Sequence, residues 1–148
     1  MVLIRIIAIA ASVMLVAAAS NPPAQDAAAV GRALATLQGT WNIMTVNGQL
    51  LTDVPQTGSL TFKGDTYAQT MNGQVVERGT IKVDPSKKPM FIDIRTTIGH
   101  AAGSAQIGLV QVVGDTMTLK TNTYATPMRP ADFKPQEWYV LIVAKRAK

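Results

Sequence analysis

The pattern of apolar and polar positions divides the chain near residue 37. Before this point lie a long apolar run over 6–19 and an alanine-rich segment over 27–37. After it, apolar residues alternate with polar ones in short runs, as in strands that bury one face. Trp41 and Ile43, for example, share one face of the first run. The pattern predicts a β domain preceded by segments of a different kind.

Tight turns are predicted between several of these runs. The Asn-Gly pairs at 47–48 and 72–73 suit type I′ hairpin turns, because both central residues of that turn need positive φ. The Gly-Asp pairs at 64–65 and 114–115 place glycine first, as type II′ turns prefer. Short links make neighbouring strands antiparallel, so the chain predicts an antiparallel sheet with mostly sequential neighbours.

We expect about eight strands, a number close to that of small ligand-binding barrels. An open sheet of this size exposes two edges, and closure into a barrel removes them. The sequence therefore predicts an all-β, up-and-down antiparallel barrel, with a two-layer sandwich as the alternative. The alternating runs lie at 41–45, 60–62, 75–83, 90–94, 110–112 and 117–121, and a further apolar run follows at 138–144.

Residues 1–19 have the three-part pattern of a secretory signal peptide. Arg5 precedes the apolar run, and Ala17-Ala18-Ala19 supplies a cleavage site before Ser20. The run is shorter than the roughly 20 residues that span a bilayer comfortably. This favours cleavage and an extracytoplasmic protein, periplasmic or secreted, without a stable membrane anchor. A signal retained as an anchor is the alternative, whereas a lipoprotein anchor is excluded because the chain has no cysteine.

Residues 20–36 are expected to form a leader that ends in a short helix, followed by the barrel domain over 37–148. The helix is predicted over 27–37, with Asp26 as its N-cap and with Gly31 weakening it. The last run of the domain, 138–144, is apolar on both sides. We therefore expect both faces of that strand to be covered, one of them by the helix.

Composition argues against several classes of partner. The chain has no cysteine and a single histidine, His100, so no zinc or copper site and no cofactor is expected. The net charge is +5, but the basic residues are scattered and cluster only at 87–88 and 145–148. Nucleic-acid binding needs a basic face interleaved with aromatic residues, so it is not expected. The sequence leaves protein partners open.

No catalytic constellation accompanies His100. It lies between Gly99 and Ala101, in a glycine- and alanine-rich stretch, with Asp93 as the nearest preceding acid. A catalytic base needs a nucleophile and an orienting group, and the Gly-x-Ser-x-Gly motif is absent. A phosphate-binding loop is absent too. We expect an exposed loop histidine and a protein that is not an enzyme.

Glu77 is the acidic residue expected to contact a ligand. Strict alternation places it on the face of Val75, Ile81 and Val83. A carboxylate that faces inward must be paired or solvated, so Glu77 could anchor a polar group of a bound molecule. The alternative is a bulge at Gly79 that turns Glu77 outward, since a glycine within a strand often marks a bulge.

Several segments, taken in order, resemble a family of small bacterial lipocalin-like domains of planctomycete type whose function is unassigned. The resemblance begins at Leu37-Gln38-Gly39-Thr40-Trp41 and implies a lipocalin-like barrel, while saying almost nothing of ligand or reaction. The chain departs from the family pattern over 99–105, where we expect a mobile loop. The matching segments are 37–41, 60–67, 79–89, 92–94, 114–119, 129–133 and 143–146.

The resemblance also implies a contact between the two ends of the domain. In lipocalins, the tryptophan of a Gly-x-Trp step packs at the closed end of the barrel, beneath a basic residue that follows the last strand. Gly39 and Trp41 match that step. We expect Arg146, or failing that Lys145, to lie within about 6 Å of the Trp41 ring centroid. The alternative is that Arg146 belongs to a frayed basic tail.

The preferred functional hypothesis is an exported lipocalin-like protein that holds a small apolar molecule in its barrel. The alternative is a structural or protein-interaction domain whose barrel is filled by its own side chains. An enzyme that uses the barrel interior is a third class. A cavity of a few hundred Å³ would favour ligand binding.

Overall fold

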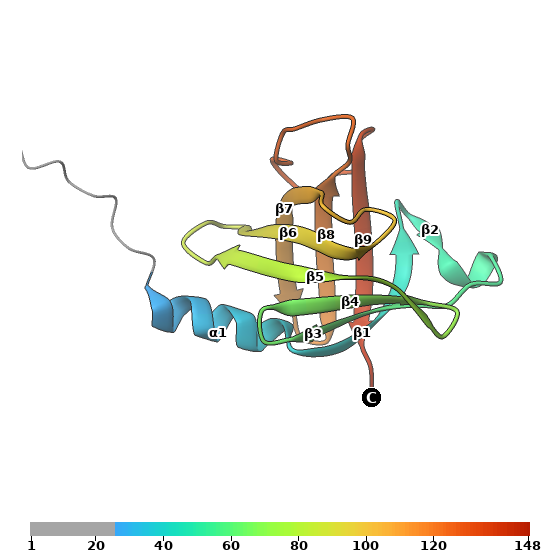
Figure 1. The fold of residues 1–148 in the computed structure, drawn as a ribbon, viewed down its shortest axis with the longest axis horizontal. Coiled ribbons are helices and arrows are strands. Elements are labelled where there is room, and N and C mark those ends of the chain that lie inside the picture. The colour runs from blue at the N-terminus through green and yellow to red at the C-terminus, as the bar shows by residue number, and fades with distance from the viewer. Residues whose placement is uncertain (1–25) are drawn as a thin grey trace, which may run out of the picture.

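The structure, a computed structural model, describes residues 26–148, which form one helix and nine strands (Figure 1). The predicted signal peptide and its cleavage site lie outside the described residues. The helix is α1 (Ala27–Leu37), and a short 3-10 helix, η1 (Leu51–Asp53), follows the second strand. The strands are β1 (Gly39–Val46), β2 (Gln49–Leu50), β3 (Gly58–Lys63), β4 (Thr66–Met71), β5 (Gln74–Asp84), β6 (Met90–Gly99), β7 (Ala105–Val113), β8 (Thr116–Asn122) and β9 (Tyr139–Arg146).

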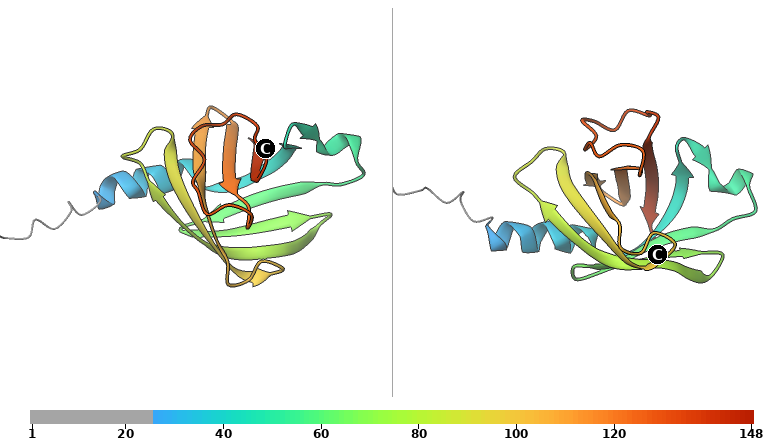
Figure 2. Two further views of the ribbon diagram at one scale, coloured as in Figure 1. Left: turned by 90° about the horizontal axis from the view of Figure 1, so that it is seen from above. Right: turned by 45° about the horizontal axis from the view of Figure 1, so that its top comes forward.

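Eight of these strands form a closed antiparallel barrel. From β3 to β9 each strand pairs with the next one in the chain, and β1 pairs with both β3 and β9. The two-residue strand β2 pairs only with the end of β1. Figure 2 shows the sheet curving round until the first and last long strands lie side by side. The predicted all-β barrel is confirmed, and the sandwich alternative is wrong.

The four predicted two-residue turns have the expected backbone conformations. Asn47 and Asn72 have φ of 51° and 49°, and the glycine after each is also positive, as type I′ turns require. Gly64 and Gly114 have φ of 61° and 59°. The aspartate after each of these two glycines does not have a positive φ, as type II′ turns require. Local sequence alone therefore sets these four links.

Helix α1 closes the end of the barrel at which β1 begins. Its N-cap is Asp26, as predicted, and the Asp26 side chain accepts a hydrogen bond from the Ala28 amide at 3.0 Å. Ala33 and Leu37 are buried and belong to the core, against which Met90 and Val112 also pack. The buried apolar side chains of the core are Ala33, Leu37, Trp41, Ile43, Leu60, Phe62, Tyr67, Ile81, Val83, Ile92, Ile94, Val110, Met117, Leu119 and Ala144.

The expectation that α1 covers the outer face of the last strand is wrong. Only Gln38 separates the helix from β1, so α1 stays at the barrel end, where it contacts β5. The strand that is buried on both sides is β8, over residues 119–122. The residues after β8, rather than the helix, cover its outer face.

The segment 123–138 packs along the outside of the barrel. Arg129 donates through Nη1 to the carbonyl oxygens of Ile92 and Gly108, which belong to β6 and β7. On β8, the buried Lys120 donates through Nζ to the Lys134 carbonyl oxygen and to Gln136 Oε1. These contacts fasten the segment to three neighbouring strands.

Candidate ligand-binding cavity

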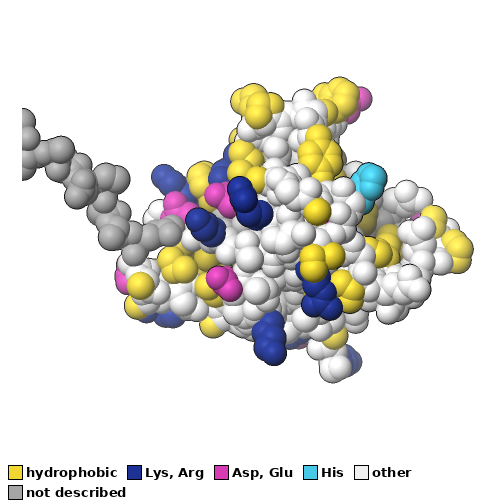
Figure 3. Space-filling model, viewed as in Figure 1, with side chains coloured by type: hydrophobic (Ala, Val, Ile, Leu, Met, Phe, Trp, Pro, Cys, Tyr) yellow, Lys and Arg dark blue, Asp and Glu magenta, His cyan; other side chains and the backbone are white. Residues whose placement is uncertain are grey.

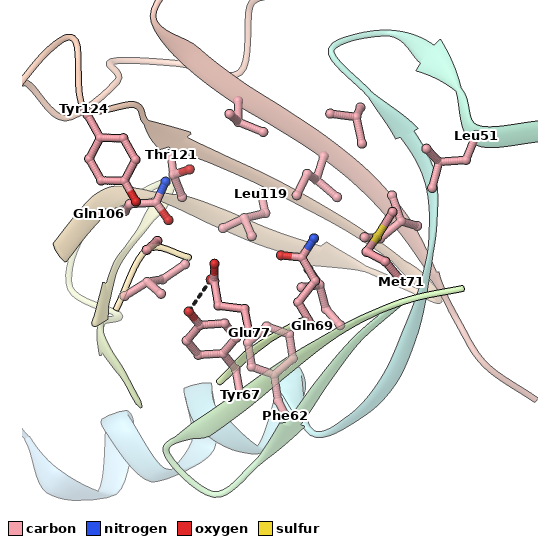
Figure 4. A pocket seen from close by; sticks show the side chains of 17 residues that line it. Leu51, Phe62, Tyr67, Gln69, Met71, Glu77, Gln106, Leu119, Thr121 and Tyr124 are labelled. Carbon is pink, nitrogen blue, oxygen red and sulfur yellow. Dashed lines mark hydrogen bonds between the residues drawn. The ribbon is translucent and has the colours of Figure 1, made fainter. Parts of the chain in front are cut away.

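A cavity of about 240 Å³ lies inside the barrel, and its lining comes from all eight long strands (Figure 4). Its walls are largely apolar, with a small number of polar groups. The lining residues are Ile43, Val46, Leu51, Leu60, Phe62, Tyr67, Gln69, Met71, Glu77, Ile94, Ala101, Gln106, Leu119, Thr121, Tyr124, Val140 and Ile142.

The arrangement of the strands explains why the cavity lies toward one end. At the closed end, Leu37, Trp41 and Met117 are fully buried and fill the interior. Toward the other end, the cavity is lined by Leu51 of η1, Ala101 of the 99–105 loop and Tyr124 of the segment 123–138. At that end the side chains leave the interior partly empty.

Glu77 is half-buried and reaches into this cavity, as Figure 4 shows. Its Oε1 atom accepts a hydrogen bond from the Tyr67 hydroxyl at 2.5 Å. The Thr96 hydroxyl lies 2.8 Å from the Tyr67 oxygen and 3.3 Å from the same Oε1 atom. A tyrosine has one hydroxyl hydrogen, which is directed to Glu77, so Thr96 is the donor in its contact with Tyr67. The three side chains form one polar cluster in the barrel wall.

Two irregularities in strand pairing lie close to Glu77, and neither turns it outward. Between β4 and β5, Gln69 faces Glu77 and Thr70 faces Val75, so Val76 is an extra residue on β5. This bulge turns Val75 outward, and 47% of Val75 is exposed. The expectation that Val75 shares the inner face is therefore wrong.

The second irregularity involves Gly79, but the extra residue is on the neighbouring strand. Arg78 faces Ile98 and Gly79 faces Thr96, which leaves Thr97 of β6 unpaired. Because β5 itself keeps its alternation from Glu77 onward, the alternative in which Glu77 faces outward is wrong.

Gly79 is needed here for space. A Cβ atom on this residue would lie 2.0 Å from the Arg95 carbonyl oxygen and 2.7 Å from the Tyr67 ring. The absence of a side chain lets the Tyr67 ring lie against the backbone of β5. In that position the Tyr67 hydroxyl reaches Glu77, which lies two residues before Gly79 on β5.

Tyr67 is held in its neutral form. Burial raises its pKa well above the ordinary value, and the hydrogen bond to Glu77 adds to the increase. The physical cause is that a phenolate would lose hydration in the barrel and would lie against a carboxylate. Tyr67 therefore serves as a stable hydrogen-bond donor that orients Glu77.

A second set of polar groups lies on the β7–β8 side of the cavity. Gln106 Nε2 donates to the Asn122 carbonyl oxygen at 3.1 Å, and the Thr121 side chain is its neighbour in the lining (Figure 4). At the mouth, the Tyr124 hydroxyl lies 3.2 Å from Ser104 Oγ. This contact joins the two loops that border the opening on that side.

The predicted contact between the domain ends is confirmed. Trp41 is fully buried, and Arg146 Cζ lies 4.1 Å from its ring centroid. Arg146 also donates to the carbonyl oxygens of Gln38 at 2.8 Å and Thr36 at 3.2 Å, while Gly39 adopts a φ of 99° beside its guanidinium. Arg146 thus serves as a cap for the end of α1, and the frayed-tail alternative is wrong for this residue.

His100 is exposed in the loop between β6 and β7, as expected (Figure 3). Asp93 does not approach it, because Asp93 forms an ion pair with Arg129 at 2.6 Å on the outside of the barrel. Within residues 26–148, no group of three potential metal-binding side chains is found. The described part of the chain also contains no helix with the length and hydropathy of a membrane span.

Comparisons of the chain with protein-family models, curated proteins and solved structures find no match. The function must therefore be argued from the cavity.

Of the residues in the cavity cluster, sequence reasoning identified Glu77 and missed Tyr67 and Thr96. Tyr67, Gln69 and Met71 alternate along β4 and all line the cavity, so period-two alternation from Tyr67 was the available signal. No local signal marks Thr96, because its role depends on Tyr67 and Thr96 both lying beside Gly79, on β4 and β6.

Proposed function

We propose that this protein is an exported, lipocalin-like carrier that binds a small, mainly apolar molecule inside its barrel. The observation that carries the proposal is the 240 Å³ cavity, which is lined by apolar side chains from all eight long strands. A domain stabilised only by its own packing would be expected to fill this space, since interiors contain few voids larger than water.

The size of the cavity limits the ligand. A dry cavity of about 150 Å³ is large enough for benzene, whereas sites for drug-sized molecules usually measure about 300–1,000 Å³. The volume of about 240 Å³ therefore suits one ring with a short substituent, or a short branched chain. A long fatty acid or a polycyclic molecule would extend beyond the mouth.

Native mass spectrometry of protein purified from its own host tests this function, combined with thermal shifts over a panel of small apolar compounds. We expect a retained small molecule or a stabilising compound. Val140→Phe should abolish the effect, because Val140 lines the cavity. Leu141→Phe, at the adjacent residue outside the lining, is the matched control. Ligand-free protein with no thermal shift for any compound would refute carrier function.

One observation favours the alternative, a domain that binds another protein. Three large apolar side chains of the segment 123–138 are exposed: Tyr124 at 70%, Met128 at 67% and Trp138 at 60%. Exposed apolar residues that gather on one surface often mark interaction sites. Replacing Met128 and Trp138 by serine separates the two functions. A carrier keeps its ligand-induced thermal shift in that variant. An interaction domain, crosslinked in its host, should no longer be joined to its protein partner.

A further inference from the structure

We propose that the preferred ligand is a small amine with a compact apolar body, bound through its ammonium group to Glu77. This inference rests on the proposed function of the barrel cavity and specifies the chemistry of its ligand. It follows from the charge of the lining, the orientation of the Glu77 carboxylate and the acceptors around it.

Glu77 gives the cavity a single negative charge. Among the described residues that line the cavity, it is the one with a charged side chain. The ion pairs formed within residues 26–148 do not include Glu77. A carboxylate in apolar surroundings gains most from a partner of opposite charge. The cavity therefore favours a cation over a neutral molecule and disfavours an anion.

The carboxylate is oriented before any ligand arrives. Tyr67 donates its hydroxyl hydrogen to Oε1 and is itself held by Thr96, and Figure 4 shows the carboxylate directed into the cavity. Since Tyr67 is held neutral, it remains a donor and keeps Oε1 occupied. Oε2 is the atom left to accept a hydrogen bond from a ligand.

Further acceptors lie within the same cavity. Gln69 is paired with Glu77 across the β4–β5 ladder, and its amide points into the cavity (Figure 4). Gln106 uses its nitrogen to bond Asn122, so its side-chain oxygen is left as an acceptor. An ammonium group has three donors and no acceptor, which matches one carboxylate oxygen and nearby amide oxygens better than a hydroxyl does.

The rest of the ligand would lie against apolar and aromatic walls. Leu60, Phe62 and Ile142 line the cavity together with the Tyr67 ring. Aromatic rings attract a nearby cation in addition to packing against the apolar part of a molecule. Fatty acids and other carboxylates fit poorly, because no basic side chain lines the described cavity.

Isothermal titration of the full mature chain with three matched compounds tests the inference. The probes are 2-phenylethylamine, the neutral 2-phenylethanol and the anionic 3-phenylpropanoate. We expect the amine to bind at least about tenfold more tightly than the alcohol, the effect of one charge-assisted hydrogen bond. The carboxylate should show no binding. Equal affinity for amine and alcohol, or tighter binding of the carboxylate, would overturn the inference.

Glu77→Gln then tests the role of the Glu77 charge. Glutamine keeps the shape of the side chain and can still accept a hydrogen bond from the Tyr67 hydroxyl. Amine affinity should fall by about tenfold or more, while alcohol affinity changes by less than about twofold. Glu137→Gln, at an exposed position outside the cavity lining, should leave both affinities unchanged. An unchanged amine affinity in Glu77→Gln contradicts the inference. The comparison of the three probes needs only the unaltered protein, so it decides even if this variant fails to fold.

The experiment separates this inference from the proposed carrier function. If the alcohol binds as well as the amine, and Val140→Phe blocks both, the carrier function stands and the amine preference is wrong. If no probe binds, the amine inference is again overturned. The thermal-shift panel of small apolar compounds then tests the carrier function independently.

Discussion

Trp41 is the residue that joins the helix, the first strand and the last strand. Its Nε1 atom donates to the Leu37 carbonyl oxygen at 2.7 Å, and its ring lies under Arg146. Arg146 in turn donates to the carbonyl oxygens of Thr36 and Gln38. A planar guanidinium can stack and donate at the same time, which a lysine at this position could not do.

Replacing Trp41 with alanine should lower the free energy of unfolding by about 3–5 kcal/mol, the usual cost of truncating a buried tryptophan. Trp41 is fully buried, so the cavity it leaves has little freedom to collapse. Urea denaturation followed by circular dichroism measures the change. Trp138→Ala is the control, because Trp138 is largely exposed and its loss should cost less than about 0.5 kcal/mol. Equal effects would contradict the role of Trp41.

Tyr67 should make stability depend on pH in the alkaline range. Burial and the Glu77 hydrogen bond raise its pKa above the ordinary value of 10.0, so the unfolded chain loses this proton at lower pH than the folded chain. Its contribution to stability is complete below about pH 10 and declines as the pH rises above it. Tyr67→Phe should therefore show a shallower fall in stability above about pH 10.

Chemical denaturation at several pH values measures this difference between the two proteins. The two proteins share every ionisable group except Tyr67, so the comparison isolates Tyr67. Tyr139→Phe is a matched control and should keep the steeper fall. Parallel pH profiles for the unaltered protein and Tyr67→Phe would contradict the predicted role.

Among the elements, the segment 123–138 shows most clearly what tertiary packing adds to local sequence. A long, proline-containing connection is usually a mobile surface loop, yet Pro130 is buried and Arg129 reaches two strands of the barrel. Lys120 supplies the second fastening point, since its ammonium group is buried under the segment and lies 4.9 Å from the Tyr139 ring centroid. A buried ammonium needs such partners, and the segment provides them.

Lys120→Met should loosen this segment while keeping the length of the side chain. The Lys134 carbonyl oxygen and Gln136 would lose their donor, at a cost of about 1–3 kcal/mol. Limited proteolysis should then cut within 123–138 faster than in the unaltered protein. Lys134→Met is the control, because the Lys134 residue is exposed and only its backbone accepts the bond. Unchanged cleavage in Lys120→Met would show that the segment is held by other contacts.

At the scale of the whole molecule, the two barrel ends have different roles. Helix α1, Trp41 and Arg146 close one end, while the other carries the loops around the cavity. On the face shown in Figure 3, basic side chains are interspersed with acidic ones rather than gathered into one patch. The cavity is thus the feature through which this domain is proposed to act.

Export is a property of the whole chain and is tested at its N-terminus. Arg5, the following apolar run and Ala17-Ala18-Ala19 predict cleavage before Ser20 by a signal peptidase. N-terminal sequencing of protein recovered outside the cytoplasm of its host should begin at or near Ser20. An intact Met1 on protein that stays with the membrane would instead support a retained anchor.

The sequence by itself determined the parts of this protein that depend on local chemistry. Asn-Gly and Gly-Asp pairs set the hairpin turns because few residues tolerate positive φ, and Asp26 set the start of α1 through its cap. Alternation of apolar residues set the strands, and many sequential strands favoured closure. The Trp41–Arg146 contact was predictable because barrel closure brings the chain ends of the domain together.

Only the tertiary structure decided features that depend on contacts between elements. The bulge at Val76 sets which residues of β5 face inward, and pairing with β4, rather than the sequence of β5, reveals it. The burial of Lys120 depends on where the segment 123–138 packs. The Tyr67–Glu77–Thr96 cluster joins three strands, so no pattern within one strand identifies it. Packing against other elements, which the sequence does not encode locally, fixes each of these.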